Sequence, residues 1–369
     1  MSSEPRKIRP GNDGLSRQER DEVVSTLSRG ELVALPTETV YGIAARASAS
    51  ALARLAEAKG RPEPQSFTWH VGSAAALETF PRGKSSGSWA LTRRLAERYW
   101  PGPLTLVVQG EAAGAEILQE SGWTGVRCPA QPTCEAILEA CDFPVVMSSL
   151  NVHGEAPVTD LSSLPKRFGG AGSPLSLLVD EGPARLAEPS TVLALGPGRF
   201  EVLRRGLIDE NSLRQAAGMN IAFVCTGNTC RSPLAEGIAR RLLAEKLGVG
   251  DDELHRFGFD VSSFGAFAMP GAPAADHTVE VLAREGIDLR SHRSRPADPK
   301  LLAGLDRIYG LTGGHLAALE GQVPKNAQLE LLDPKGHDVP DPIGQGEAAY
   351  VQTAEVIREA LKARLAEWV

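Results

Sequence analysis

Cys225 to Pro233 read CTGNTCRSP, and the four residues before them, 221–224, read IAFV. The apolar run predicts a buried strand, and the spacing of apolar residues after the loop predicts a helix that begins at Ser232-Pro233. We expect Ser232 to be the N-cap of this helix and Pro233 to take its first position. The stretch therefore predicts a strand–loop–helix unit that opens a parallel α/β domain.

The loop in this unit has the residue types of an anion site. Gly227 and Asn228 tolerate left-handed backbone, which turns successive N–H groups inward at a helix N-terminus. A cysteine at the base of such a nest, here Cys225, is favoured as a thiolate, and the guanidinium of Arg231 matches phosphate oxygens. This combination indicates covalent catalysis through phosphocysteine. A bare C-x5-R spacing also occurs by chance around a structural cysteine, and the strand–loop–helix context favours catalysis.

A phosphoryl transfer also needs a proton for its leaving group. Near the end of the chain, residues 338–344 read DVPDPIG. Asp341, held extended before Pro342, is the candidate general acid, although an Asp-Pro pair is also a common turn.

The loop and the late Asp-Pro together resemble the low-molecular-weight protein phosphatase family over residues 219–369. The resemblance implies that Cys225 is the nucleophile, that Arg231 binds phosphate and that Asp341 is the acid. It implies that Ser232 hydrogen-bonds the thiolate and that Asn228 holds the loop. The supporting residues of the loop are then Asn228, Thr229, Cys230 and Ser232. Cys230 is a potential disulfide partner of Cys225 under oxidation.

The position before the second cysteine bears on the substrate. Family members that act on phosphotyrosine usually carry a larger apolar residue there and aromatic residues after the Asp-Pro, where this chain has Thr229 and Ile343-Gly344. The threonine is similar to the protein-arginine phosphatases of the family. The resemblance therefore favours phosphoarginine, with phosphotyrosine as the alternative.

The first half of the chain carries a series of polar motifs at the ends of expected strands. They are PTETVYG (36–42), KGRP (59–62), WPGPLT (100–105), VRCP (126–129), SLN (149–151), PSTV (189–192) and LRRG (203–206). Their cations, hydroxyls and amides suit a polyanion and a small polar ligand, with no obvious nucleophile or base. Each motif alone is also a common turn or helix end, so the prediction depends on the ordered set.

The ordered set resembles the YrdC-like threonylcarbamoyl-adenylate synthase family over about 15–208. The resemblance implies a twisted open α/β sheet with a wide cavity, in which ATP, L-threonine and bicarbonate give threonylcarbamoyl-AMP and pyrophosphate. The product feeds threonylcarbamoyladenosine formation in tRNA, and Mg²⁺ is expected on the ATP phosphates. The implied ATP-binding residues are Lys59, Arg61, Ser149, Asn151 and Arg204. The implied threonine-binding residues are Thr39, His70, Arg127 and Ser190.

The chain departs from this family's pattern at a few positions. Ser66-Phe67 stand where the family usually has Pro-Leu, and Leu150 and His153 stand where it usually has small residues. We expect Leu150 and His153 to add bulk inside the nucleotide cleft. The alternative interpretation makes the first half an inactive nucleotide- or double-stranded-RNA-binding module that regulates the phosphatase.

Length and composition set the frame for both halves. A chain of 369 residues exceeds what one core usually serves, so we expect a disordered tail (1–14), a YrdC-like domain (15–208), a linker (209–218) and a Rossmann-like parallel α/β phosphatase domain (219–369). The net charge of −7 gives no general attraction for nucleic acid. The five cysteines, an odd number without zinc spacing, predict a reducing compartment and no structural metal. With neither a membrane-length apolar run nor a secretory signal, the sequence predicts a bifunctional cytoplasmic enzyme.

Overall fold

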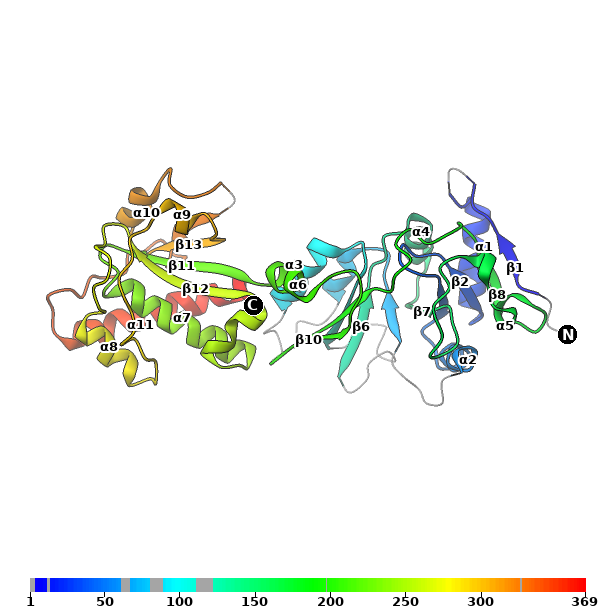
Figure 1. Cartoon of the computed structure of the whole chain (residues 1–369), viewed down its shortest axis with the longest axis horizontal. Helices are drawn as coiled ribbons and strands as arrows, with labels where there is room; N and C mark the ends of the chain where they lie inside the picture. The colour runs from blue at the N-terminus through cyan, green and yellow to red at the C-terminus, as the bar shows by residue number, and fades with distance from the viewer. Residues whose placement is uncertain are drawn as a thin grey trace. The chain divides into compact units, whose positions relative to one another are not determined.

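The computed structural model describes residues 4–11, 14–60, 67–79, 89–110, 122–196, 198–325 and 327–369. Contacts divide the chain into two compact units, the first made of Met1–Ser86 and Thr92–Leu213, the second of Gly87–Leu91 and Arg214–Val369. Both units combine helices with strands, which confirms the predicted α/β class (Figure 1). Most of the predicted linker, 209–218, is the helix α6 (Glu210–Ala217).

The first unit is built on a mixed sheet, which has ten strands within the described residues, in the order β1-β8-β2-β3-β7-β4-β6-β5-β9-β10. The pairs β1–β8, β2–β8, β4–β6 and β5–β9 are parallel and the others antiparallel. The strands are β1 (Arg6–Ile8), β2 (Leu32–Leu35), β3 (Gly42–Arg46), β4 (Thr68–His70), β5 (Leu104–Gln109), β6 (Trp123–Arg127), β7 (Val145–Ser149), β8 (Leu175–Val179), β9 (Thr191–Gly196) and β10 (Arg199–Arg204).

The helices that accompany this sheet are α1 (Arg17–Ser28), α2 (Ala49–Lys59), α3 (Trp89–Tyr99), α4 (Pro132–Ala140) and α5 (Lys166–Gly169). The helix α6 runs across the point after Leu213 where the first unit ends in the sequence. Apolar residues of α1 and α4, such as Leu27 and Ile137, pack with β2, β7 and β8 in one buried cluster. Gly60 ends α2 in the left-handed region (φ 64°), which favours glycine, and Lys59 is the last residue of the helix.

The second unit has a four-stranded sheet, with the order β12-β11-β13-β14, in which every pair is parallel. Its strands are β11 (Met219–Cys225), β12 (Phe259–Gly265), β13 (Arg307–Gly310) and β14 (Gln328–Leu331), and its helices are α7 (Arg231–Leu247), α8 (Asp276–Ala283), α9 (Pro299–Leu302), α10 (Gly313–Leu319) and α11 (Glu347–Trp368). The predicted parallel sheet is confirmed. Because β11 is an inner strand that ends at Cys225, the thiol lies at the carboxyl edge of the sheet, where α/β proteins bind ligands.

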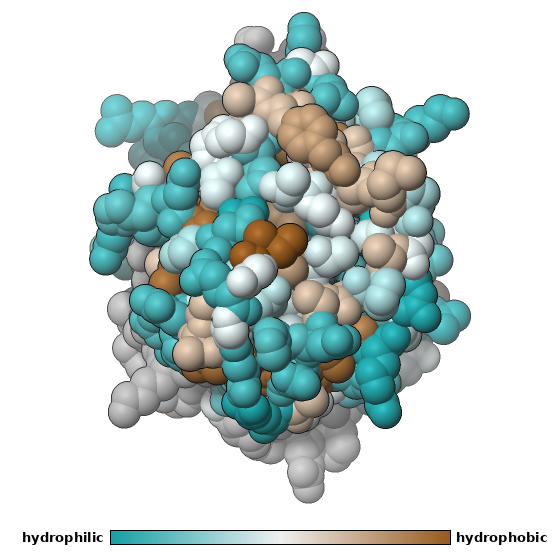
Figure 2. Space-filling view, turned by 90° about the vertical axis from the view of Figure 1, so that its left-hand side faces the viewer, coloured by the Kyte–Doolittle hydropathy of each residue, from teal (hydrophilic) through white to brown (hydrophobic). Residues whose placement is uncertain are grey.

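Figure 2 looks onto this end of the second unit. Hydrophobic residues lie there mostly singly within a hydrophilic surface. In the described part of the chain, no helix is both long and apolar enough to cross a membrane.

Three aromatic rings hold the last helix against the sheet of the second unit. Phe223 of β11, Tyr309 of β13 and Trp368 of α11 are fully buried, with ring centroids 5.9 to 6.3 Å apart. The indole Nε1 of Trp368 also donates a hydrogen bond to the Tyr309 hydroxyl at 3.1 Å. The end of the chain is therefore part of the core.

We expect Trp368→Ala to lower the free energy of unfolding by about 3–5 kcal/mol, because it leaves a cavity against the rings of Phe223 and Tyr309. Urea unfolding followed by circular dichroism measures this. Val356→Ala on the exposed side of the same helix is the control and should change the midpoint little. Equal midpoints for the two variants would show that the ring cluster does not stabilise the unit.

Candidate active sites

The loop between β11 and α7 wraps around the thiol of Cys225. Cys225 is buried, and its Sγ lies 3.0 Å from the hydroxyl of Ser232. Asn228 has a φ of 55°, and its Nδ2 donates to Ser232 Oγ at 2.9 Å and to Ser263 Oγ at 2.8 Å. Gly227 is not in the left-handed region, so Asn228 supplies the turn that the sequence assigned to both residues.

The helix after the loop begins earlier than the sequence predicts. Cys230 is the N-cap residue of α7, and Arg231 is its first residue, so Ser232 and Pro233 lie inside the first turn. The prediction of Ser232 as the cap and Pro233 in the first position was wrong. The Ser232 hydroxyl faces Cys225, Asn228 and the carbonyl of Phe264 (3.2 Å), so it serves the loop instead of a backbone N–H.

Neighbouring elements fix the loop from outside. The carbonyl of Asn228 accepts a hydrogen bond from His292 Nε2, and its Oδ1 accepts one from the backbone N–H of Arg295, both at 2.8 Å. At Gly265 of β12, an added Cβ would lie 2.7 Å from the carbonyl oxygen of Thr226 and 2.9 Å from the backbone nitrogen of Asn228. Only glycine leaves room for the loop there, so these contacts together fix the backbone of the loop.

The structure joins the two other predicted catalytic residues. Arg231 is buried, and its Nη2 donates to Asp341 Oδ2 at 2.5 Å, while Nη1 donates to the carbonyl of Val339 at 3.4 Å. The Asp341 side chain is 43% exposed. The predicted cation and the predicted acid therefore meet, with the acid open to solvent.

The remaining loop residues form a second polar contact. Cys230 is buried, and its Sγ lies 3.5 Å from the Tyr350 hydroxyl and 3.6 Å from Thr229 Oγ1. Burial and the contact with Cys230 raise the pKa of Tyr350 to about 12. Both Cys225 and Cys230 are free thiols.

Sequence reasoning missed a histidine beside the loop. His315 of α10 lies with Nε2 3.0 Å from Thr226 Oγ1 and Nδ1 3.0 Å from Thr312 Oγ1. Burial and the nearby charge of Arg231 lower the pKa of His315, so the ring is neutral near pH 7. The sequence holds no signal for this contact, because the histidine follows a different strand.

The first unit contains a cavity of about 320 Å³ at the ends of its central strands. Of the predicted residues, those that line it are His70, Arg127, Ser149, Asn151, Ser190 and Arg204. Thr39 and Lys59 are buried next to lining residues, which they contact through hydrogen bonds. Arg61 lies outside the described residues, as does Ser66.

Lys59 holds one wall of this cavity in place. Its Nζ donates to the carbonyl of Ser149 at 2.6 Å, to Ser149 Oγ at 3.2 Å and to Asn151 Oδ1 at 2.5 Å. Ser149 Oγ in turn lies 2.6 Å from Asn151 Oδ1. The buried ammonium therefore fixes the SLN segment, whose serine and asparagine face the cavity.

Leu150 and His153 do not fill the cavity, so the expectation that they add bulk there was wrong. Leu150 is fully buried, and its backbone bonds to Tyr41 and Val158. Successive side chains of an extended segment point to opposite faces, which puts Leu150 in the core and its two neighbours on the cavity. His153 is exposed, and Phe67 is the departing residue that lines the cavity.

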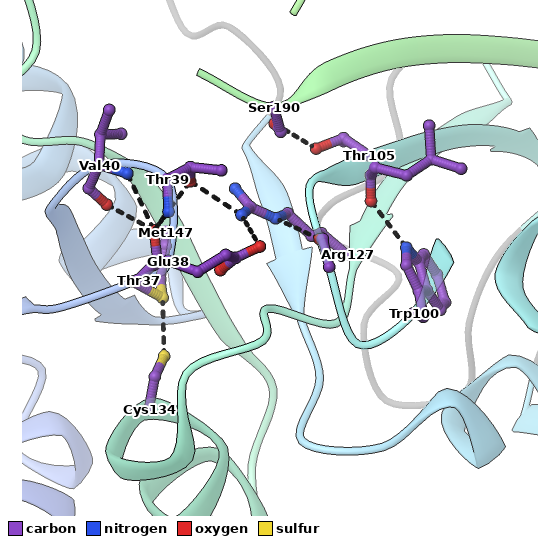
Figure 3. Close-up of polar contacts among 12 residues, drawn as sticks. Thr37, Glu38, Thr39, Val40, Trp100, Thr105, Arg127, Cys134, Met147 and Ser190 are labelled. Carbon is purple, nitrogen blue, oxygen red and sulfur yellow. Dashed lines mark hydrogen bonds and ion pairs between the residues drawn. The ribbon is translucent and has the colours of Figure 1, made fainter. Parts of the chain in front are cut away.

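A buried ion pair lies at the cavity, with Arg127 in its lining and Glu38 outside it. Arg127 Nη2 donates to Glu38 Oε1 and to Thr39 Oγ1, both at 2.8 Å, and Figure 3 shows Arg127 reaching both side chains. Arg127 Nε bonds to the carbonyl of Gly102 at 3.3 Å. Glu38 is the second residue that sequence reasoning missed, although it lies within the quoted PTETVYG motif.

A second arginine adds to the positive charge around the cavity. Arg204 donates from Nε to the carbonyl of Ser190 at 3.0 Å and from Nη2 to Ser190 Oγ at 2.9 Å. Burial and the charge of Arg127 lower the pKa of Arg204, although an arginine stays protonated near neutral pH. Two like charges that line one cavity favour an anionic ligand.

His70 is a neutral acceptor on the same wall. Its Nδ1 lies 3.0 Å from the carbonyl of Thr68, which can only accept, so Nδ1 carries the hydrogen and Nε2 is an acceptor. Burial, and then the charge of Arg127, lower the pKa of His70 to about 3. No group of three or more His, Cys, Asp or Glu side chains could hold a metal in the ranges that the structure describes.

Two family profiles match the chain, one in each half. The profile of the Sua5/YciO/YrdC family, described as telomere recombination, matches residues 25–206. The profile described as low molecular weight phosphotyrosine protein phosphatase matches residues 220–368.

Individual relatives agree with this division. A threonylcarbamoyl-AMP synthase of Pyrococcus abyssi is 31% identical over 52% of this chain, which spans 55% of that relative, and the Mus musculus protein of that name is 30% identical over 53% of this chain and 71% of its own length. A protein-arginine-phosphatase of Bacillus subtilis is 34% identical over 39% of this chain and 93% of its own length. A solved structure of Pyrococcus abyssi Sua5 shares the fold at a TM-score of 0.50 and 21% identity, over 96% of this chain and 97% of that one.

The chain therefore belongs to two families, with a Sua5/YrdC domain in its first half and a low-molecular-weight phosphatase domain in its second.

The buried neutral His70 predicts a loss of stability in acid. In the unfolded chain His70 takes up a proton near pH 6.5, and in the folded chain it does so only near pH 3. The free energy of unfolding therefore falls as the pH drops below 6.5. Between pH 7 and pH 5 this one residue should lower the free energy of unfolding by about 2 kcal/mol. Urea unfolding of the wild type and of His70→Gln at both pH values measures it. An equal pH dependence for the two proteins would contradict the prediction.

Proposed function

We propose that the chain is a bifunctional enzyme. Its first unit makes threonylcarbamoyl-AMP from ATP, L-threonine and bicarbonate for tRNA modification, and its second removes phosphate from proteins through a phosphocysteine. The observation that carries the first activity is the cavity between Arg127 and Arg204. The observation that carries the second is the Cys225 loop in contact with Ser232 and closed by Arg231. The free thiols of all five cysteines favour a reducing compartment such as the cytoplasm.

In the first unit, catalysis would come from positioning and from charge. Arg204, Ser149 and Asn151 would bind the phosphates of ATP, with the SLN segment held by Lys59. Arg127 and the acceptor Nε2 of His70 would bind threonine. The threonine amine and bicarbonate, by way of carbon dioxide, give a carbamate and water. A carbamate oxygen then forms a bond to the α-phosphorus while the bond to pyrophosphate breaks. The two arginines offset the charge that collects on the phosphates.

Mg²⁺ would enter this cavity with the nucleotide. Among the described lining residues, Glu155 has the carboxylate, and the others are neutral or cationic. That set suits an ion that is held mainly by phosphate oxygens and water. Magnesium would neutralise phosphate charge as pyrophosphate leaves.

Arg204→Ala should lower threonine-dependent pyrophosphate release by the purified chain about 10- to 100-fold, because charge-assisted phosphate bonds contribute about 1.5–3 kcal/mol. The assay supplies ATP, threonine and bicarbonate and measures pyrophosphate. Arg199→Ala, at the other end of the same strand and outside the cavity lining, is the control. ATP binding by the wild type without threonine-dependent turnover would favour the alternative, an inactive nucleotide- or RNA-binding module that regulates the phosphatase.

In the second unit, the thiolate of Cys225 would attack the phosphorus atom. An S–P bond forms as the bond to the leaving group breaks, and Asp341 gives that group its proton. Water then attacks the phosphocysteine, Asp341 takes a proton from it, and phosphate leaves. Ser232, which lies 3.0 Å from the sulfur, would stabilise the thiolate between the two steps.

Phosphoarginine is the substrate that we favour, with phosphotyrosine as the alternative. Thr229 offers a hydroxyl within the loop. Ile343 follows the Asp-Pro at the position where an aromatic side chain would be needed to stack on the phenyl ring of phosphotyrosine. The 34% sequence identity between the second half and a protein-arginine-phosphatase of Bacillus subtilis supports the same choice.

Cys225→Ser should abolish turnover of p-nitrophenyl phosphate and of a phosphoarginine peptide while the fold is kept, because a hydroxyl stays protonated where a thiol ionises. Cys230→Ser is the matched control and should retain most activity under reducing conditions. Thr229→Ile should shift preference toward the aryl phosphate. Wild-type rates for Cys225→Ser on both substrates would mean that the loop is a structural turn.

A further inference from the structure

Glu38 has an unusual environment for a carboxylate. Its side chain is 1% exposed, and Oε1 accepts the hydrogen bond from Arg127. Its other oxygen, Oε2, is buried and has no hydrogen-bond partner among the residues that the structure describes. A buried acceptor without a partner costs stability, and such groups in native proteins call for an explanation.

The contacts of Arg127 suggest that explanation. Its Nη2 is taken by Glu38 and Thr39, and its Nε by Gly102, so the guanidinium plane is fixed on two sides. Its Nη1 has no partner among the described residues. Because Arg127 lines the cavity, its Nη1 belongs to a side chain that a ligand in the cavity can reach.

A merely structural pair would not need these charges. Replacing a buried ion pair by apolar residues is often neutral or stabilising, so burial alone does not favour keeping Glu38 and Arg127. Glu38 is also the carboxylate in contact with Arg127, which shares the cavity with Arg204. Without Glu38, the two guanidinium groups would repel each other with no fixed anion beside them.

We propose that Glu38 is the positioning residue of the amino-acid subsite. It holds Arg127 so that Nη1 binds the carboxylate of the amino-acid substrate. The identity of the substrate rests on the function proposed above. The placement of Arg127 by Glu38 does not.

The experiment compares Glu38→Gln, Glu38→Asp and the wild type in the full chain, with pyrophosphate release measured against threonine at saturating ATP and bicarbonate. Glutamine keeps an acceptor for Arg127 but loses the charge, so the hydrogen bond that holds Arg127 becomes a weaker, neutral one. We expect the KM for threonine to rise roughly tenfold, which corresponds to the difference in strength between a charged and a neutral hydrogen bond. The KM for ATP should stay within about twofold of the wild type. Glu38→Asp, which keeps the charge, should restore much of the affinity for threonine.

Glu57→Gln, an exposed glutamate on α2, is the control for the substitution itself. An unchanged KM for threonine in Glu38→Gln would overturn the proposal. An equal rise in the KM values for threonine and ATP would overturn it as well, because that pattern reports general damage to the cavity.

A crystal structure of Glu38→Ala separates this proposal from the proposed function. We expect the Arg127 guanidinium to leave Thr39 Oγ1 and move within the cavity. If Arg127 keeps its place, Glu38 does not position it, whatever the activity. If Arg127 moves but the wild type shows no threonine-dependent turnover, the proposed function fails while the placement of Arg127 by Glu38 stands.

Discussion

Each half of this protein buries an arginine at its candidate site and bonds it to a carboxylate. Arg127 and Arg231 are each only 5% exposed, and a guanidinium removed from water to that degree needs an anion beside it. Glu38 meets that need in the first unit and Asp341 in the second. The surrounding hydroxyls, carbonyls and tight backbone turns are arranged around these two pairs.

The two pairs differ in how readily the anion can be exchanged. Glu38 is as buried as its partner and comes from the PTETVYG motif, which is bound to Arg127 also through Thr39. Asp341 is nearly half exposed and lies in a proline-rich segment. The first pair is built as a fixed part of a wall, and the second as a contact that a ligand oxygen can replace. This difference would suit the proposed functions, in which the cavity orients an amino acid and the loop binds and releases phosphate.

The sequence predicted most where the interacting residues are close together in the chain. Cys225, Asn228 and Ser232 lie within one loop and one helical turn, so the family resemblance that this short motif carries already implied their contacts. The prediction that Ser232 caps the helix was wrong. Its hydroxyl has several possible partners, and it lies against the Cys225 thiol and the Asn228 amide instead of a backbone N–H. Leu150 was misplaced because a motif gives the order of residues but not the face on which each lies.

Contacts between distant segments were harder to foresee. Glu38 was inside a quoted motif, yet its partner is on β6, and a glutamate in a loop is ordinarily exposed. His315 comes from α10 and meets Thr226 only because β11 and β13 are neighbours in the sheet. Such pairs depend on the order of strands, which local patterns do not specify.

The bond between Asp341 and Arg231 would affect product release in the proposed phosphatase reaction. Asp341 is a tethered anion whose effective concentration at the guanidinium is set by the chain and cannot be diluted. Every free oxyanion that reaches the loop would have to compete with this carboxylate, including the phosphate that the proposed reaction produces. The loop would thus carry its own competitor, which would lower its affinity for product and make the enzyme less sensitive to phosphate in its surroundings.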